Sequence, residues 1–466
     1  MLENKSWQSE IQAALWKEFE IFRVMKALQL RTIAYRCGIT KNQGVEPFSI
    51  LVALVFLTFL GKSVHHFVSH CRNSLFDLGG KDVFYRLSTR TSINWRRFMM
   101  DISLKVVRHF KSFSSWQQRV LVIDDTVIQK AGKKIEEVSW VFDHSKGKSV
   151  KGFSAVVLGW SDRSSFIPVD FALQRSSQKV FKQSTTPEMD KRALAWHRRQ
   201  EAVKDKPTLV KEMLKRAKQK GLDAGAVLFD SWYCMPKLVS SIFHEIGYDV
   251  IAMLKTTPTL TVAVNGKIFS TKRLWECVVP SLRKETLTIS NELVSVSCVN
   301  ALFGGTSVKL VFCKPLRKSK SKKPIILLST DITLTSAQII ETYGKRWAVE
   351  VLFKDAKSKL FFGKNQSRSF EATICFLTLS LVRFIILSYM ERINGDFRHK
   401  GSLYEELRYE VEELNILAFM DKFLKRLLSI IDGVKETFAL FTDKLNDIQG
   451  VIRISIENLL FQRCET

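Results

Sequence analysis

The chain lacks the paired cysteines that mark disulfide scaffolds and zinc sites. Its eight cysteines are scattered through 466 residues, and none forms a CxxC pair or a Cys/His spacing suited to zinc. We therefore expect reduced thiols in a cytoplasmic protein. A secretory signal is also not expected, because the segment MLENKSWQSEIQ has no basic region leading into an apolar core.

Apolar runs long enough to cross a membrane are missing too. FSILVALVFLTFLG, which begins at Phe48, is shorter than the roughly 20 apolar residues that a bilayer requires. TICFLTLSLVRFIILSYM is longer, but Arg383 interrupts it. Both runs predict buried helices of a globular protein, and we expect no membrane partner.

Acidic residues are scarce relative to basic ones. The 72 Lys and Arg outnumber the 46 Asp and Glu, which gives a net charge of +26. An excess of this size favours a polyanionic partner, and nucleic acid is the first candidate. A hydrophobic content of 46% in 466 residues allows two or three globular domains with sizeable cores.

The pattern of apolar residues changes along the chain and predicts a mixed α/β protein. Residues 1–115 read as a helical N-terminal domain, and 116–255 as alternating strands and helices. Short alternating strands fill 256–335, where Asn265-Gly266 is a turn signal. Helices return in 336–395 and continue through a C-terminal region, 396–466, that we expect to serve packing or dimerisation.

The end of the N-terminal region has two readings. KDVFYRLSTRTSINWRRFMMDISLKVVRHF, residues 81–110, contains a short apolar helix, a Ser/Thr-rich turn and a longer basic helix. That order suits a DNA-binding helix-turn-helix, whose second helix would enter the major groove. A plain helical hairpin fits the same pattern equally well.

Acidic residues stand at three places in the sequence where they could take part in catalysis. The apolar strand RVLVIDDTVI ends in Asp124 and Asp125, AGAVLFD ends at Asp230, and Glu350 follows the β-rich segment. A carboxylate at the end of an apolar strand is costly unless its charge is offset. A structural, hydrogen-bonded role would explain the aspartate at the end of either strand taken alone. Taken together, in a basic protein, the acids are suited to bind Mg²⁺. Two such ions can activate water and stabilise the leaving oxygen of a phosphodiester.

The segment YGKRWAVEVLFKDAK, residues 343–357, predicts a helix with one polar face. Tyr343, Arg346, Glu350 and Lys357 stand at offsets of 3, 7 and 14. At roughly 100° per residue these side chains share one arc of the helix. The face is either a solvated stripe with an Arg346–Glu350 ion pair, or a surface that holds phosphates around a metal-binding Glu350.

These residues resemble a known family. Y-x2-R-x3-E-x6-K is the signature of the IS-four (insertion sequence four) family of DDE transposases, and the chain matches it at the four positions just given. IDDT and LFDSWY resemble the family's two aspartate motifs, which places its first acid on Asp125 and its second on Asp230. The resemblance covers about residues 80–390. Strand alternation lets only one of Asp124 and Asp125 face the metals, and the motif selects Asp125.

The resemblance implies an RNase H-like catalytic core interrupted by a β-rich insertion, with helical N- and C-terminal regions. It implies that Asp125, Asp230 and Glu350 are catalytic and bind two Mg²⁺ ions, or Mn²⁺ in their place. Arg346, Lys357 and Tyr343 would hold the DNA backbone. The partners implied are transposon-end DNA and target DNA, bound by a homodimer, in a prokaryotic cytoplasm at the nucleoid.

An aromatic residue of the insertion receives a flipped base in some members of that family. Trp275 is the nearest candidate, because its ring could stack on a base. A Trp between short strands is more often part of a core.

The sequence therefore favours an active cut-and-paste DNA transposase over two alternatives. The first is a non-catalytic DNA-binding protein derived from a transposase, which loss of an acid would favour. The second is a structure-selective nuclease on the same fold. The polar face of 343–357 goes beyond what such a nuclease needs.

Overall fold

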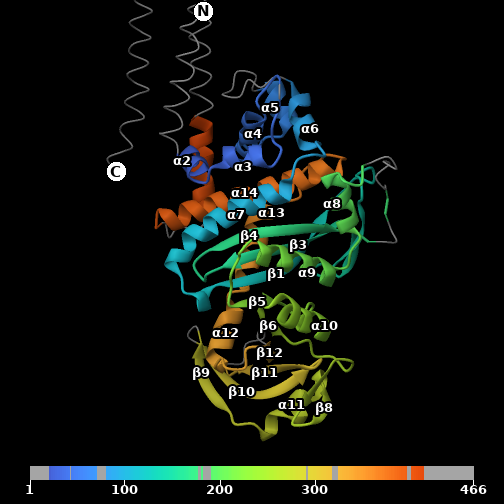
Figure 1. Cartoon of the computed structure of the whole chain (residues 1–466), viewed down its shortest axis with the longest axis vertical. Helices are drawn as coiled ribbons and strands as arrows, with labels where there is room; N and C mark the ends of the chain where they lie inside the picture. Colours follow the sequence, from blue (N-terminus) through green and yellow to red (C-terminus); the bar gives the residue numbers. More distant parts are fainter. Residues whose placement is uncertain are drawn as a thin grey trace, which may run out of the picture. The chain divides into compact units, whose positions relative to one another are not determined.

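The computed structural model describes residues 20–41, 43–70, 80–176, 180–181, 190–289, 292–316, 324–395 and 400–413. Contacts divide the chain into two compact units. Unit 1 comprises residues 1–87 and 397–466, and unit 2 comprises 88–396. Described residues on both sides of unit 2, 20–87 and 400–413, therefore share unit 1, and the acids and the 343–357 segment all lie in unit 2. Figure 1 shows the whole chain, coloured along the sequence.

Unit 1 is helical in its described part. The helices α2 (Glu20–Ala27), α3 (Leu30–Arg36), α4 (Pro47–Phe59) and α5 (Val64–His70) precede α6 (Lys81–Ser88), whose last residue belongs to unit 2. The predicted burial of α4 is confirmed, because its residues are buried except Ser49. Residues 400–413 are also helical, and the Tyr404 hydroxyl donates to the Thr58 carbonyl of α4 at 3.1 Å.

Unit 2 is built on one large mixed sheet. Its central strands are β1 (Val120–Gln129), β3 (Lys148–Ser161), β4 (Phe166–Gln174), β5 (Ala226–Phe229) and β6 (Asp249–Met253). The order β4-β3-β1-β5-β6 joins three antiparallel strands to two that run parallel to β1. This mixed α/β arrangement is consistent with an RNase H-like fold. A further strand, β2 (Ser139–Asp143), extends the β3 edge.

The segment 256–335 is strand-rich, as the sequence predicts, and it continues the same sheet. β12 (Ile325–Ser329) pairs antiparallel with β6 and links it to β11 (Thr306–Pro315) and β10 (Glu292–Phe303). Shorter strands complete this end of the sheet: β7 (Thr261–Val264), β8 (Lys267–Ser270) and β9 (Glu285–Ile289). The one-turn helix α11 (Leu274–Cys277) follows β8, and short turns of 3₁₀-helix flank it at Thr271–Arg273 and Val279–Ser281.

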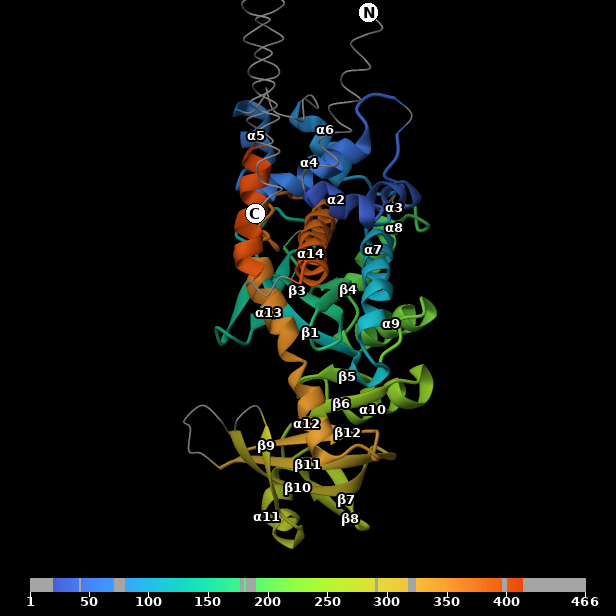
Figure 2. The same ribbon diagram turned by 90° about the vertical axis from the view of Figure 1, so that its left-hand side faces the viewer.

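Helices cover the sheet of unit 2. They are α7 (Trp95–Phe110), α8 (Leu194–Ala202), α9 (Lys206–Gln219), α10 (Pro236–Ser240), α12 (Ser336–Gly344), α13 (Trp347–Ser358) and α14 (Phe370–Ile393). Figure 2 shows α13 and α9 on opposite sides of β1. Single turns of 3₁₀-helix, Lys111–Phe113 and Trp116–Gln118, lead from α7 to β1, and a π-helical turn, Ser241–Ile246, follows α10.

The helix α14 is the one in the described residues that is long and apolar enough to cross a membrane. It is nevertheless a core helix of unit 2, since 89% of its most apolar stretch is buried. Arg383 in its middle is 2% exposed and donates to the Leu360 carbonyl at 3.4 Å. The prediction of a buried helix is confirmed.

The predicted helical pair at 81–110 is present as α6 and α7. Asn94 caps α7, because its side chain accepts a hydrogen bond from the Arg97 amide. The apolar face of α7, which includes Phe98 and Ile102, is buried, and the helix packs on β4 and α14. Residues 88–110 therefore belong to unit 2 by their contacts, so its boundary precedes the predicted one at 115.

Candidate active site

One face of β1 and the helix α13 share a set of charged contacts. Arg346 donates from Nη1 to Asp124 Oδ2 at 3.0 Å, and it also pairs with Glu350. Lys357 donates to the hydroxyl of Thr126. Asp124 and Thr126 are two residues apart on β1 and therefore point to the same face. We call this the α13 face, and it joins β1 to a helix more than 200 residues later in the chain.

Asp230 reaches this group from the next strand. β5 runs parallel to β1, with Val122 opposite Leu228, and Asp124 and Asp230 each stand two residues beyond that pair. Burial and the charge of Asp230 raise the pKa of Asp124 to about 7, although Arg346 acts in the opposite direction. Burial and the charge of Asp125 raise the pKa of Asp230. Asp230 is thus close enough to both Asp124 and Asp125 for the like charges to repel.

Asp125 points to the opposite face, beside α9, which we call the α9 face. Lys206 pairs with Asp125 Oδ2 at 2.7 Å, and the Ser154 hydroxyl donates to the same oxygen at 3.0 Å. The Tyr233 hydroxyl donates to Asp125 Oδ1 at 2.7 Å. Burial and Asp125 raise the pKa of Tyr233 well above its ordinary value. The sequence motif selects Asp125 as the first acid, whereas Asp124 shares a face with Arg346 and Glu350.

The single helix predicted for 343–357 is interrupted. Tyr343 lies in the last turn of α12, which ends at Gly344, and Lys345 and Arg346 form a turn before α13. The Arg346 amide bonds to the Tyr343 carbonyl, three residues back, in place of the carbonyl four residues back. Both turn residues keep right-handed helical dihedrals. Three of the four predicted residues still lie together: the Arg346 guanidinium is 5.9 Å from the centre of the Tyr343 ring, and it pairs with Glu350.

Tyr343 and Lys357 lie at different places in this group. Burial raises the pKa of Tyr343 to about 12, and the charges of Asp230 and Asp124 contribute to the rise. Tyr343 is therefore beside the aspartates. Lys357 contacts Thr126, so it lies along β1 and not against Glu350.

Trp275 stands apart from these residues in sequence and in the fold. It lies in α11, in the strand-rich segment, and is half-buried. Its ring packs edge-to-face on Phe312 of β11, with the ring centres 5.3 Å apart. This contact is typical of core packing, and the base-binding role stays a prediction.

The sequence analysis missed the three residues that contact Asp125 on the α9 face: Lys206, Ser154 and Tyr233. Tyr233 carries a local signal, because it follows Asp230 in the quoted motif DSWY. Lys206 carries none, since 81 residues separate it from Asp125. Its Nζ also lies 4.7 Å from the centre of the Trp232 ring, and that ring is 37% exposed. A lysine and an exposed indole thus flank the acids.

The donor atoms of these acids suit Mg²⁺, which prefers carboxylate oxygens. Among the residues that the structure describes, no group of three His, Cys, Asp or Glu side chains is arranged to hold a metal ion. Arg346 pairs with both Asp124 and Glu350 and so stands between two of the acids. The oxygen donors fit Mg²⁺, and Arg346 would have to release Asp124 or Glu350 for these acids to bind the ion.

The basic stretch KRALAWHRRQ is largely part of α8 and is engaged internally. Arg198 pairs with Glu201, and Arg199 pairs with Glu136 and Glu371. These arginines do not form a free basic face. The other basic stretch singled out in the sequence, RKSKSKK at 317–323, lies outside the described residues.

Two family models match the chain. The first, described as "DDE superfamily endonuclease", matches residues 84–268 and includes Asp124, Asp125 and Asp230. The second, described as "Archaeal putative transposase ISC1217", matches residues 189–391 and includes Asp230 and Glu350. No curated protein matches the chain.

The two matches overlap at residues 189–268, which include β5 and Asp230, and together they span the sheet, α13 and the acids described above. Neither description mentions the four-residue signature at 343–357. One description names an endonuclease and the other a putative transposase. Residues 84–391 are therefore similar to families of DDE endonucleases and transposases.

Proposed function

We propose that this protein is a DNA transposase that moves an insertion sequence by a cut-and-paste mechanism. It would hydrolyse phosphodiesters at the transposon ends and then transfer the freed 3′ hydroxyl ends into target DNA. The observation that carries the proposal is the meeting of Asp124, Asp230, Arg346 and Glu350, which come from β1, β5 and the start of α13. A structural ion pair needs only one acid for each guanidinium, whereas in this group three acids lie around the single guanidinium of Arg346.

The uncompensated acids favour a divalent cation. Two Mg²⁺ ions, or Mn²⁺, would activate water and stabilise the leaving oxygen when bound. Asp230, which follows β5, and Glu350 of α13 are two of the proposed metal ligands. β1 would supply the third ligand: the sequence motif favours Asp125, and the face shared with Arg346 favours Asp124. We propose Asp124 as the closer ligand and Asp125 as the residue that Lys206 and Tyr233 hold in place.

The cations and the phenol of this group would hold DNA. Arg346 can present two parallel N–H donors to a phosphate, and its release from Asp124 or Glu350 would free those donors. Lys357 supplies a point charge farther along β1, and Tyr343 supplies a hydroxyl donor. These contacts position the backbone and carry no sequence information.

The partners follow from the charge and the reaction. A net charge of +26 suits transposon-end DNA and target DNA. A homodimer would bring two ends together, and the C-terminal region from 396 was predicted to support it. Most of that region lies outside the described residues, and its residues 400–413 belong to unit 1.

Membership of the IS-four family is part of the proposal. It rests on the spacing of Tyr343, Arg346, Glu350 and Lys357 and on the contacts that the first three make. A cytoplasmic, nucleoid-associated location would follow from that membership. Trp275 would receive a flipped base only if it left its contact with Phe312.

The test is cleavage of a plasmid that carries the gene's own flanking DNA. Wild-type protein is assayed with Mg²⁺ and with EDTA, and the Glu350→Gln variant is assayed with Mg²⁺. We expect metal-dependent double-strand release at the element ends by the wild type alone. Joining of the released ends to a second plasmid separates a transposase from a structure-selective nuclease.

The rival function is DNA binding without catalysis. It predicts binding to the same ends, measured by gel shift, with no cutting in any metal. Equal cutting by Glu350→Gln and wild type would instead show that the active site has been assigned wrongly.

A further inference from the structure

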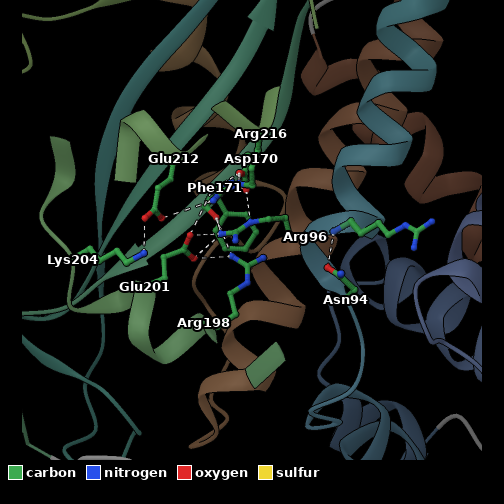
Figure 3. A network of polar contacts seen from close by, with 10 residues as sticks. Asn94, Arg96, Asp170, Phe171, Arg198, Glu201, Lys204, Glu212 and Arg216 are labelled. Atoms are coloured by element: carbon green, nitrogen blue, oxygen red, sulfur yellow. Dashed lines mark hydrogen bonds and ion pairs between the residues drawn. The ribbon is translucent and has the colours of Figure 1, made fainter. Parts of the chain in front are cut away.

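A second group of charged residues in unit 2 has no role in the proposed reaction. It is buried between β4, α7, α8 and α9, and it centres on Asp170 and Glu201 (Figure 3). Arg96 pairs with Asp170 at 3.0 Å and with Glu201 at 2.6 Å, and Arg216 pairs with Asp170 at 2.8 Å. Arg198 lies 3.5 Å from Glu201. Three guanidinium groups therefore share two buried carboxylates. A third carboxylate, that of the more exposed Glu212, lies 4.0 Å from Arg216 and pairs with Lys204.

The third guanidinium is incompletely satisfied. Arg198 uses Nη1 to reach Glu201 and the Phe171 carbonyl. Its Nη2 is buried and has no hydrogen-bond partner among the described residues. Burial and the neighbouring Arg96 lower the pKa of Arg198 to about 10. A buried charged donor without an acceptor is rare in proteins and calls for an explanation.

A cavity of about 150 Å³ lies against this group. Arg96 and Arg198 line it, and so does Trp95, whose side chain is buried. The Trp95 indole N–H is likewise buried and has no hydrogen-bond partner among the described residues. Arg90 and His197 also line this space, and the one acid of its lining, Glu371, pairs with Arg199. Arg198 and Trp95 thus bring two donors without hydrogen-bond partners to the residues around this space.

Two helices begin at the same cavity. Trp95 and Arg96 are the first residues of α7, and Leu194 and Ala195 are the first residues of α8. The N-cap residue of α8, Ala193, offers no side-chain acceptor to the first turn. The first amides of a helix lack partners within it, and the helix dipole makes that end favourable for an anion.

We propose that this cavity binds a tetrahedral oxyanion, namely a phosphate group. One water needs only roughly 10–15 Å³ of space of this kind, so a cavity of 150 Å³ has room for a phosphate group. Arg198 and Trp95 would donate hydrogen bonds to its oxygens, and the starts of α7 and α8 would contribute their dipoles. The phosphate could be the free anion or a phosphate of a nucleic acid. The inference does not depend on the proposed nuclease activity.

The first experiment follows thermal unfolding and calorimetric binding of the full chain in inorganic phosphate. Sodium chloride of equal ionic strength is the reference, and EDTA removes divalent cations that could bring phosphate to the carboxylates of the candidate active site. We expect phosphate to raise the unfolding temperature with saturation, because it binds only the folded protein. Equal effects of phosphate and chloride would mean that water fills the cavity, and would overturn the proposal.

Variants locate the site. Arg198→Met removes one orphan donor and should abolish saturable binding. Since that buried change could prevent folding, Thr91→Glu is the second variant: Thr91 is exposed and lines the cavity, and a carboxylate there should weaken phosphate binding roughly tenfold. Thr286→Glu is the matched control, since Thr286 is exposed on β9 and outside the cavity lining. Equal weakening by the two glutamates would overturn the site.

Oligonucleotides distinguish the source of the phosphate. Short single strands with a 5′ phosphate or a 5′ hydroxyl are compared in the wild type and in Thr91→Glu. A preference for the 5′ phosphate that Thr91→Glu removes would identify a nucleic-acid end as the ligand. Binding of inorganic phosphate without that preference would identify the free anion.

Discussion

The two buried charged groups of unit 2 are unbalanced in opposite directions. On the α13 face, Asp124, Asp230 and Glu350 face one guanidinium, that of Arg346. Around Asp170 and Glu201, three guanidinium groups face two carboxylates. The first group has an excess of negative charge, and the second has an excess of positive charge.

The pKa values of the acids are also shifted in opposite directions in the two groups. Burial and Asp230 raise the pKa of Asp124 to about 7. Burial alone would also raise the pKa of Asp170, but Arg96 and Arg216 lower it below its ordinary value. Burial is therefore common to both groups, and the local ratio of charges decides the result. A group that is short of cations suits a metal, and a group that is short of anions suits a phosphate.

The largest expected effect tests the first group. Asp124→Asn should lower DNA cleavage more than about a hundredfold, beyond the loss typical of residues that only support a metal ligand. Asp125→Asn should lower cleavage less, because Asp125 contacts Lys206, Tyr233 and Ser154 on the α9 face. The measurement is the rate of plasmid cleavage, with DNA binding as the control for folding. The reverse order would restore Asp125 as the ligand selected by the motif.

The sequence predicts the parts of this group that depend on local patterns. An acid at the end of an apolar run identifies Asp230, because the run and the acid are neighbours in the chain. Helical spacing brings Tyr343, Arg346 and Glu350 together. The break between α12 and α13 is not predictable in this way, since Lys345 and Arg346 keep helical dihedrals and only the hydrogen bonds shift.

The remaining contacts depend on the packing of distant segments. The choice between Asp124 and Asp125 follows from which helix lies on which face of β1, and no local pattern encodes that. Asp170 illustrates the same limit. It stands in the buried strand FIPVDFALQ, so the sequence indicates that it needs a partner. Its partners Arg96 and Arg216 are 74 and 46 residues away.

An intermediate effect, on stability, is expected from the second group. Asp170→Asn should destabilise the protein by about 3–5 kcal/mol, because it leaves Arg96 and Arg216 buried with too little negative charge. The measurement is the midpoint of denaturant unfolding. Asp190→Asn is the control, since the Asp190 side chain is 56% exposed and its pair with Arg192 is at the surface. Similar midpoints for the two variants would show that the charges around Asp170 do not stabilise the fold.

The smallest effect is expected at the rim of the same group. Lys204 pairs with Glu212 next to Arg216, and the two side chains are 38% and 34% exposed (Figure 3). Lys204→Gln should change stability by less than about 1 kcal/mol, because water screens an ion pair at this exposure. Phosphate binding should also be unchanged, since Lys204 does not line the cavity. A loss as large as that of Asp170→Asn would mean that the charge balance of the group extends to its surface, so that the count of three guanidinium groups and two carboxylates is too narrow.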